Sequence, residues 1–316
     1  MGASPSSIAD HVAATPDLDR YGPPVRSAWQ DVDWREHQRW LQVNARRINL
    51  VELGDGPPIV FVHGHSGSWS NWLENLPHFA ERHRVVAFDL PGFGHSEMPA
   101  QGVSIENYGR TVDAVMEELG VDQAAIVGNS MGGFVGAELA LKFPHRVQRL
   151  VLVSAAGLAT KYIGLSAEFL RRRSVVAFAR AVNTYASFPE ARASTLMRRP
   201  RLRRALLGMV AHHPDRLPVP ISMELVRGTG KPAAADALDA LLDYDYRDRL
   251  EDVRCPTLIV WGEDDRTVPV ESAGEYERLI PGSRKVVLLD TGHVPMVERP
   301  VRFNALLDEF LAEEPS

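Results

Sequence analysis

The chain has 316 residues, 45% hydrophobic and 24% charged, a composition typical of a soluble globular protein with room for one large domain and an insertion. Its formal net charge of −6 argues against nucleic-acid binding, and its single cysteine, Cys255, excludes an internal disulfide framework and a cysteine-based metal site. Residues 1–10 lack the features of a secretion signal, and no apolar stretch approaches roughly 18 residues, so we expect a cytoplasmic protein.

The first part of the chain predicts an arm, a hairpin and a buried strand. Residues 1–25 are rich in Ala, Ser, Pro and Asp and predict a loosely held arm. Two antiparallel strands, at 40–43 and 48–53, are expected around a turn at 45–47, and a buried strand follows at 59–62.

A glycine-rich loop, His63-Gly64-His65-Ser66-Gly67, follows the buried strand. Such a loop can present backbone N–H groups to an anion, for example the oxyanion of a tetrahedral intermediate. The loop lacks the Gly-x-x-x-x-Gly-Lys-Ser/Thr spacing of a phosphate loop. We expect His63 to support the loop and His65 to line a pocket. The next helix is predicted to begin with Ser70 or Asn71 as its cap and to run to about 79.

A second motif lies between a predicted strand at 124–127 and a predicted helix at 133–143. Its sequence, Gly128-Asn129-Ser130-Met131-Gly132, has the Gly-x-Ser-x-Gly pattern of a nucleophile elbow. Glycines avoid collisions in so sharp a turn, and the strained backbone lifts the Ser130 hydroxyl clear of the chain. An ordinary strand-to-helix turn has the same short pattern. Asn129 is either a turn former or a hydrogen-bonding neighbour of the site.

The alternation of strands and helices continues through a strand at 85–88, a turn from Asp89 to Ser96 that we interpret as structural, a helix at 105–119 and a strand at 147–153. It then breaks. Residues 158–247 are helical in character and predict an inserted helical cap between the core segments 26–157 and 248–316.

The predicted cap is basic. It holds 15 Lys and Arg against 8 Asp and Glu, a net charge of +7, concentrated at 171–173 and 198–204. These arginines form either a solvated helix face or a contact for an anionic membrane surface or an acidic substrate group. His212 and His213 have no partner at metal-ligand spacing, so we interpret them as surface or pocket-lining residues.

Alternation resumes with a strand at 256–261, a helix at 270–280, a strand at 285–289 and a helix at 300–312. The fold class is therefore α/β, with a mostly parallel sheet covered by helices on both faces. Reactive groups gather at the carboxyl ends of such strands, where Ser130, Asp264-Asp265 and His293 are found. A serine hydroxyl needs a base such as imidazole, and a carboxylate fixes the tautomer of that imidazole.

From roughly Arg39 to Leu311 the chain resembles the α/β-hydrolase fold enzymes. The resemblance lies in the His63-Gly64 loop and in four further motifs: Asp89-x-x-Gly92-x-Gly94-x-Ser96, Gly128-Asn129-Ser130-Met131-Gly132-Gly133, Gly262-x-x-Asp265 and Gly292-His293. It implies Ser130 as nucleophile, His293 as base and Asp265, rather than Asp264, as the acid. It also implies oxyanion donors at the backbone N–H groups of Met131 and of His65, or of Ser66, with no cofactor or metal.

Three motifs bear on which branch of the α/β-hydrolase family the chain resembles. Ser130 argues against the relatives that carry Asp at the elbow, the dehalogenases and epoxide hydrolases. The Gly-Asn-Ser-Met-Gly-Gly elbow resembles that of C–C hydrolases acting on ring-fission products, whose oxyanion loop is typically His-Gly-Gly-Gly-Pro-Gly and whose histidine is typically followed by Trp. Here the loop differs and Val294 follows His293.

Residues 292–300 look more like those of general esterases and monoacylglycerol-lipase-like enzymes. We therefore expect a serine hydrolase acting on a small-molecule carboxylic ester, with no nucleic-acid partner. A C–C bond hydrolase and a ligand-sensing receptor on the same fold are the alternatives.

Overall fold

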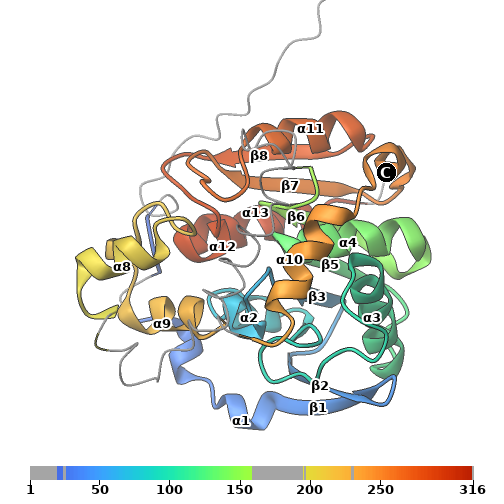
Figure 1. The fold of residues 1–316 in the computed structure, drawn as a ribbon, viewed down its shortest axis with the longest axis horizontal. Coiled ribbons are helices and arrows are strands. Elements are labelled where there is room, and N and C mark those ends of the chain that lie inside the picture. Colours follow the sequence, from blue (N-terminus) through green and yellow to red (C-terminus); the bar gives the residue numbers. More distant parts are fainter. Residues whose placement is uncertain (1–19, 24–25, 159–194, 196, 229–230, 315–316) are drawn as a thin grey trace, which may run out of the picture.

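The computed structural model describes residues 20–23, 26–158, 195, 197–228 and 231–314. One eight-stranded sheet organises them, in the order β1-β2-β4-β3-β5-β6-β7-β8, from β1 at the bottom of Figure 1 to β8 at the top. β1 pairs with β2, and β2 with β4, in antiparallel fashion, whereas the remaining neighbours are parallel. The predicted α/β class with a mostly parallel sheet is confirmed.

All eight predicted strands are present. The strands are β1 (Gln38–Val43), β2 (Arg46–Leu53), β3 (Pro58–Val62), β4 (Arg84–Phe88), β5 (Ala124–Asn129), β6 (Val147–Val153), β7 (Thr257–Gly262) and β8 (Arg284–Leu288). The α-helices of the described residues are α1 (Trp34–His37), α2 (Leu76–Ala80), α3 (Ile105–Glu118), α4 (Met131–Lys142), α8 (Pro200–Leu207), α9 (Val219–Arg227), α10 (Ala234–Asp243), α11 (Glu271–Leu279), α12 (Pro295–Glu298) and α13 (Pro300–Ala312). The 3-10 helices are η1 (Ala28–Asp31), η2 (Trp69–Trp72), η3 (Pro144–Arg146), η5 (Pro214–Arg216) and η6 (Arg247–Asp252).

The sheet has a hydrophobic core on each face because its strands are apolar on both sides. In β3, Val60 and Val62 pack with residues of α3, α4 and α11, whereas Ile59 and Phe61 pack with residues of α2 and α13. Side chains alternate between faces along a strand, so a continuous apolar run buries both. The two cores fix the strands, and with them the loops at the carboxyl ends.

Two local predictions were wrong. The hairpin turns at Asn44 and Ala45, both with positive φ, so Arg46 and Arg47 already belong to β2. The helix predicted up to residue 79 is two short pieces, η2 and α2, and Ser68 rather than Ser70 or Asn71 is the cap of η2. The Asn71 side chain instead accepts a hydrogen bond from the Ser68 N–H (2.8 Å), which completes a capping box.

The segment between β6 and β7, residues 158–247 and hereafter the insertion, is helical in its described part, with α8, α9 and α10 and no strand among those residues. Figure 1 shows α10 crossing in front of the sheet and α8 and α9 at its side. The Ala233 N–H donates to the Gly92 carbonyl (3.2 Å), and Gly228 packs against the Ser66 carbonyl. The insertion therefore lies on the loops that follow β3 and β4. Arg171–Arg173 lie outside the described residues.

Two residues within the predicted N-terminal arm, residues 1–25, are bound to the core. Tyr21, inside the range 1–25, donates its hydroxyl proton to Glu298 (2.7 Å), and the Gly22 N–H donates to the Glu298 carbonyl (2.6 Å). These two residues are bound to the core, so the prediction of a loosely held arm is wrong for them. In the part of the chain that the structure describes, no helix has the length and apolar character needed to cross a membrane.

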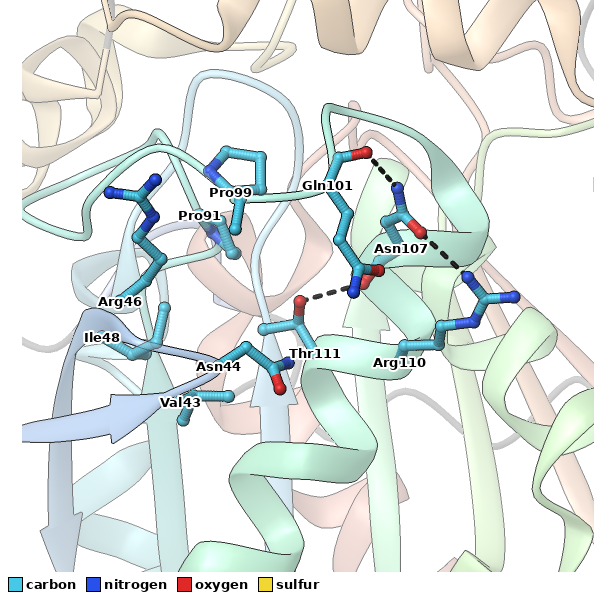
Figure 2. A pocket seen from close by; sticks show the side chains of 11 residues that line it. Val43, Asn44, Arg46, Ile48, Pro91, Pro99, Gln101, Asn107, Arg110 and Thr111 are labelled. Carbon is cyan, nitrogen blue, oxygen red and sulfur yellow. Dashed lines mark hydrogen bonds between the residues drawn. The ribbon is translucent and has the colours of Figure 1, made fainter.

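Two hollows lie away from the predicted site residues. One, of about 30 Å³, lies between the β1–β2 turn and the first half of α3, and it holds no more than one or two waters (Figure 2). The other, of about 350 Å³, lies between α3 and α10 and is lined by Asp236, Asp239 and Asp243. Neither is lined by Ser130 or His293.

Candidate active site

The turn between β5 and α4 holds Ser130 in a strained conformation. Its φ of 55° and ψ of −117° are rarely adopted by residues other than glycine. A Cβ at Gly128 would lie 2.2 Å from the Gly132 carbonyl oxygen, and one at Gly132 would lie 2.1 Å from the Val62 carbonyl oxygen. Only glycine fits at these two positions, for the steric reason that the sequence pattern predicts.

An acid–base pair lies at the ends of β7 and β8. The Nδ1 atom of His293 is 2.8 Å from Oδ2 of Asp265, and the other oxygen of Asp265 accepts the N–H groups of Thr267 and Val268, each at 2.8 Å. An ionised carboxylate can only accept, so in the neutral imidazole Nδ1 carries the proton and Nε2 has the lone pair.

Asp264, the alternative acid, lies elsewhere. Its side chain is 39% exposed and its Oδ2 is 3.7 Å from Nε2 of His212. The structure therefore brings Asp265, and not Asp264, to the imidazole of His293.

Asn129 joins the elbow to the histidine loop. Its Nδ2 donates to the carbonyl oxygens of Val153 and His293, each at 3.1 Å. Of the two interpretations of Asn129, the structure favours the hydrogen-bonding neighbour. Ser130 and His293, 163 positions apart in the chain, are thus held in adjacent loops.

The glycine-rich loop after β3 packs directly on the elbow. A Cβ at Gly64 would lie 3.0 Å from the Cβ of Ser130. The loop turns at His65 and Ser66, closed by the Gly67 N–H donating to the Gly64 carbonyl (3.1 Å). Met131 begins α4, so its N–H has no acceptor within the helix. Gly64 and Met131 thus both adjoin Ser130, which is compatible with the predicted oxyanion donors at Met131 and in the loop after Gly64.

Two neutral histidines hold that loop. Nε2 of His63 accepts the Leu90 N–H (2.9 Å), so its Nδ1–H donates to the Gly64 carbonyl (2.7 Å). Nε2–H of His65 donates to the Ala234 carbonyl of α10 (2.6 Å), and its Nδ1 accepts the Ser66 hydroxyl (3.0 Å). Burial lowers the pKa of both imidazoles. His65 therefore connects the loop to the insertion.

The turn after β4 is organised by Asp89, which is fully buried. Its carboxylate accepts the backbone N–H groups of Trp69 (2.9 Å) and His95 (2.8 Å) and the side-chain amide of Asn49 (2.7 Å). These bonds fit the structural role that the sequence suggests for this turn.

Sequence reasoning did not select Glu298, which contacts the histidine loop, or Tyr21, which contacts Glu298. The Glu298 carboxylate accepts backbone N–H groups on both sides of His293, and Tyr21 donates to it. A glutamate ending the otherwise apolar stretch 294–297 was the available signal for Glu298. Nothing in the sequence near Tyr21 pointed to this contact.

A third group, His212, His213 and Asp290, places three possible metal ligands within 4.8 Å of one another. We predicted no metal-ligand partner for the two histidines from the sequence, and the structure brings Asp290, just after β8, beside them. Nε2 of His213 is 2.6 Å from Oδ1 of Asp290, while Arg299 and Arg216 lie 2.9 and 3.8 Å from its Oδ2. Two guanidinium groups already neutralise this carboxylate, so the cluster suits an ion-pair network better than a cation.

Comparisons with known proteins agree with this architecture. The alpha/beta hydrolase fold family matches residues 57–300, more than half of the chain, so the chain belongs to that family. It is 32% identical, over 87% of its length and 96% of the relative's, to 2-hydroxy-6-oxo-2,4-heptadienoate hydrolase of Pseudomonas putida.

Two solved structures are also similar. Est816, described as an N-acyl homoserine lactone degrading enzyme, is 28% identical with a TM-score of 0.67, over 86% of this chain and 100% of Est816. A bacterial membrane phospholipase A is 28% identical with a TM-score of 0.68, over 87% of this chain and 85% of the phospholipase. The protein is therefore an α/β-hydrolase.

Proposed function

We propose that this protein is a serine hydrolase that cleaves a carboxylic ester of small or medium acyl length through an acyl-enzyme intermediate. The observation that carries the proposal is the hydrogen-bonded pair of Asp265 and His293, joined through Asn129 to the strained turn at Ser130. A serine, an imidazole and a carboxylate in this relation form the catalytic triad of serine hydrolases.

In this mechanism Ser130 attacks the ester carbonyl while Nε2 of His293 takes its proton. The Asp265 carboxylate stabilises the resulting imidazolium, and the N–H groups of Met131 and His65 hold the oxyanion. His293 then protonates the leaving alcohol. Water, activated by His293, releases the acid and restores Ser130. Each oxyanion donor lowers the activation free energy by about 3–4 kcal/mol.

C–C bond hydrolysis is the second candidate. The Pseudomonas putida relative is named as a 2-hydroxy-6-oxo-2,4-heptadienoate hydrolase, and 96% of its length matches this chain. We favour ester hydrolysis for two reasons within the site. Ser66 stands at a φ of 57° in the loop where C–C hydrolases typically carry a run of glycines, and buried Val294 follows His293 where they typically carry Trp.

The test is hydrolysis of p-nitrophenyl esters of increasing acyl length by wild type and Ser130→Ala. Turnover that is lost in the variant supports the proposal, and the best chain length measures the acyl pocket. Ser154→Ala is a matched control. Ser154 directly follows β6 with a φ of 45°, and among the described residues its hydroxyl has no hydrogen-bond partner. Turnover of a vinylogous diketone acid, with none of the esters, would favour the C–C reaction, and no turnover of either would favour a receptor.

We also propose that α8 contacts anionic membrane surfaces. Arg198, Arg199 and Arg201 are exposed there beside Leu206 (43% exposed) and Met209 (60% exposed), a basic and apolar mixture suited to a headgroup region. Arg203 and Arg204 are less available because both bond to Asp215. The resemblance to a membrane phospholipase A supports this contact.

The test of the membrane contact is sedimentation with vesicles containing phosphatidylserine at low salt. Changing Arg198, Arg199 and Arg201 to Gln should weaken binding several-fold, and vesicles of phosphatidylcholine alone should bind neither form. Equal binding of wild type and variant would leave these arginines as a solvated helix face.

A further inference from the structure

The orientation of His293 is set by contacts from several distant segments. Its N–H donates to the Val210 carbonyl of the insertion (2.9 Å), its carbonyl accepts Asn129 (3.1 Å), and its Nδ1 bonds Asp265 (2.8 Å). Those bonds use its backbone groups and Nδ1 and leave Nε2 for the serine. The base can point correctly only if the backbone of residues 292–294 is held in place.

A single buried carboxylate holds that backbone on both sides. Glu298 is fully buried, and it accepts the N–H groups of Gly292 (3.0 Å) and Val294 (3.2 Å). The three successive N–H groups at 292, 293 and 294 thus go to Glu298, to Val210 and again to Glu298. The loop cannot tilt without breaking at least one of these bonds.

The same carboxylate collects two donors from elsewhere in the chain. The N–H of His212, in the insertion, donates to Oε2 (2.8 Å), and so does the hydroxyl of Tyr21 (2.7 Å). Tyr21 in turn accepts the N–H of His213 (2.8 Å). A carboxylate has about four lone-pair sites, and here the N-terminal segment, the insertion and the histidine loop fill them.

Close packing supports the same arrangement. A Cβ at Gly292 would lie 2.7 Å from the His212 nitrogen, and one at Gly262 would lie 2.1 Å from the Gly292 carbonyl oxygen. The loop therefore lies between the end of β7 and the insertion. A displaced residue on either side would press on it.

We propose that Glu298 is a positioning residue for His293, and that through it the insertion segment 210–213 and Tyr21 form part of the frame that orients the base. This inference rests on the proposed function, in which His293 is the base. A catalytic group displaced by about 1 Å can cost roughly 100-fold in rate, so the frame has a catalytic consequence beyond stability.

The decisive variant is Glu298→Gln. It keeps the shape of the side chain but replaces one acceptor oxygen by an amide group, which cannot accept the backbone N–H groups that face it. We expect kcat to fall about 10- to 100-fold, as a partial displacement of the base would produce, with KM changed less than about 3-fold. The rate at which a p-nitrophenyl phosphonate modifies Ser130 should fall by the same factor as kcat.

A spectroscopic readout addresses the base directly. The Nδ1 proton shared by His293 and Asp265 should give a proton NMR signal far downfield, assigned by its loss in Asp265→Asn. We expect this signal to shift or broaden in Glu298→Gln. The matched control is Glu138→Gln, because Glu138 is also a buried glutamate (1% exposed) and accepts a tyrosine hydroxyl, that of Tyr244 (2.7 Å), rather than the 292–294 backbone. The control should lose stability but keep the phosphonylation rate and the signal.

The outcomes separate the two proposals. A wild-type phosphonylation rate and an unmoved signal in Glu298→Gln would overturn the positioning role. If the variant fails to fold, Tyr21→Phe decides, with an expected 2- to 5-fold loss of phosphonylation rate, and no loss would overturn the proposal. Wild type that is phosphonylated yet hydrolyses no ester would contradict the proposed reaction and leave the Glu298 comparison valid. Wild type that is not phosphonylated would overturn both.

Discussion

The elbow around Ser130 and the loop around His293 lie side by side, yet they are built in opposite ways. The elbow depends on its own glycines, with Gly128 meeting the carbonyl of Gly132 four positions on. The histidine loop depends on Asp265, Glu298, Val210 and Asn129, drawn from four other places in the chain. Local strain thus positions the proposed nucleophile, whereas hydrogen bonds that come mostly from distant segments position the proposed base.

The largest effect should come from breaking the support of the base at Asp265. Asp265→Asn should lower kcat about 10,000-fold with little loss of stability, because an amide can present its NH₂ group to the imidazole and reverse the tautomer. Steady-state kinetics and thermal unfolding measure both quantities. Asp264→Asn is the matched control and should retain activity, since Asp264 faces His212 instead. A crippled Asp264→Asn with an active Asp265→Asn would reverse the assignment of the acid.

A smaller effect should follow from cutting the connection between the two regions. Asn129→Ala removes the donor to the His293 carbonyl and leaves two buried carbonyls without it. We expect the free energy of unfolding to fall by about 1–3 kcal/mol and kcat to fall about 10-fold.

Denaturant titration and kinetics together test this connection. Asn304→Ala is the control, because Asn304 is also buried and bonds Asn75 (2.7 Å) and the Glu74 carbonyl (3.2 Å), outside the elbow and the histidine loop. This control variant should lose stability but keep its kcat. Equal kcat values for the two variants would show that the elbow and the histidine loop are positioned independently.

The smallest expected effect is a loss of stability at low pH, caused by the two histidines of the loop beside the elbow. Burial lowers the pKa of His63 and His65 in the folded protein, whereas both have a pKa of about 6.5 when unfolded. The unfolded chain therefore binds more protons below about pH 6.5. Their contribution to stability is complete above that pH and is lost as the pH falls toward the folded values, at up to about 1.4 kcal/mol per pH unit for each group.

The variant His65→Gln isolates one of these groups. Denaturant unfolding between about pH 7.5 and 5.5 should show a shallower loss of stability than in wild type. An unaltered slope in His65→Gln would mean that burial does not hold His65 neutral in the folded protein.

The contrast between the two regions explains what the sequence could predict. The eight strands and the glycine pattern at 128–132 are local, so apolar runs and steric reasoning found them. The resemblance to the α/β-hydrolases, through Gly262-x-x-Asp265, favoured Asp265 over Asp264, and the structure places Asp265 beside His293. Tyr21 was missed because its partners, Glu298 and His213, are 277 and 192 positions away, and no local pattern encodes such contacts. Glu298 is close in sequence to Gly292 and Val294, but nothing in the sequence shows that its side chain turns back onto their N–H groups.

The contacts of residues 210–213 also bear on how such an enzyme changes its substrate over evolution. An insertion between two strands looks like an exchangeable unit that could be replaced whole by that of a relative. Here such an exchange would remove the Val210 carbonyl and the His212 N–H from the histidine loop. We expect a working chimera to retain this short stretch together with Ala234, whose carbonyl holds His65, so that new specificities arise in the remaining parts of the insertion.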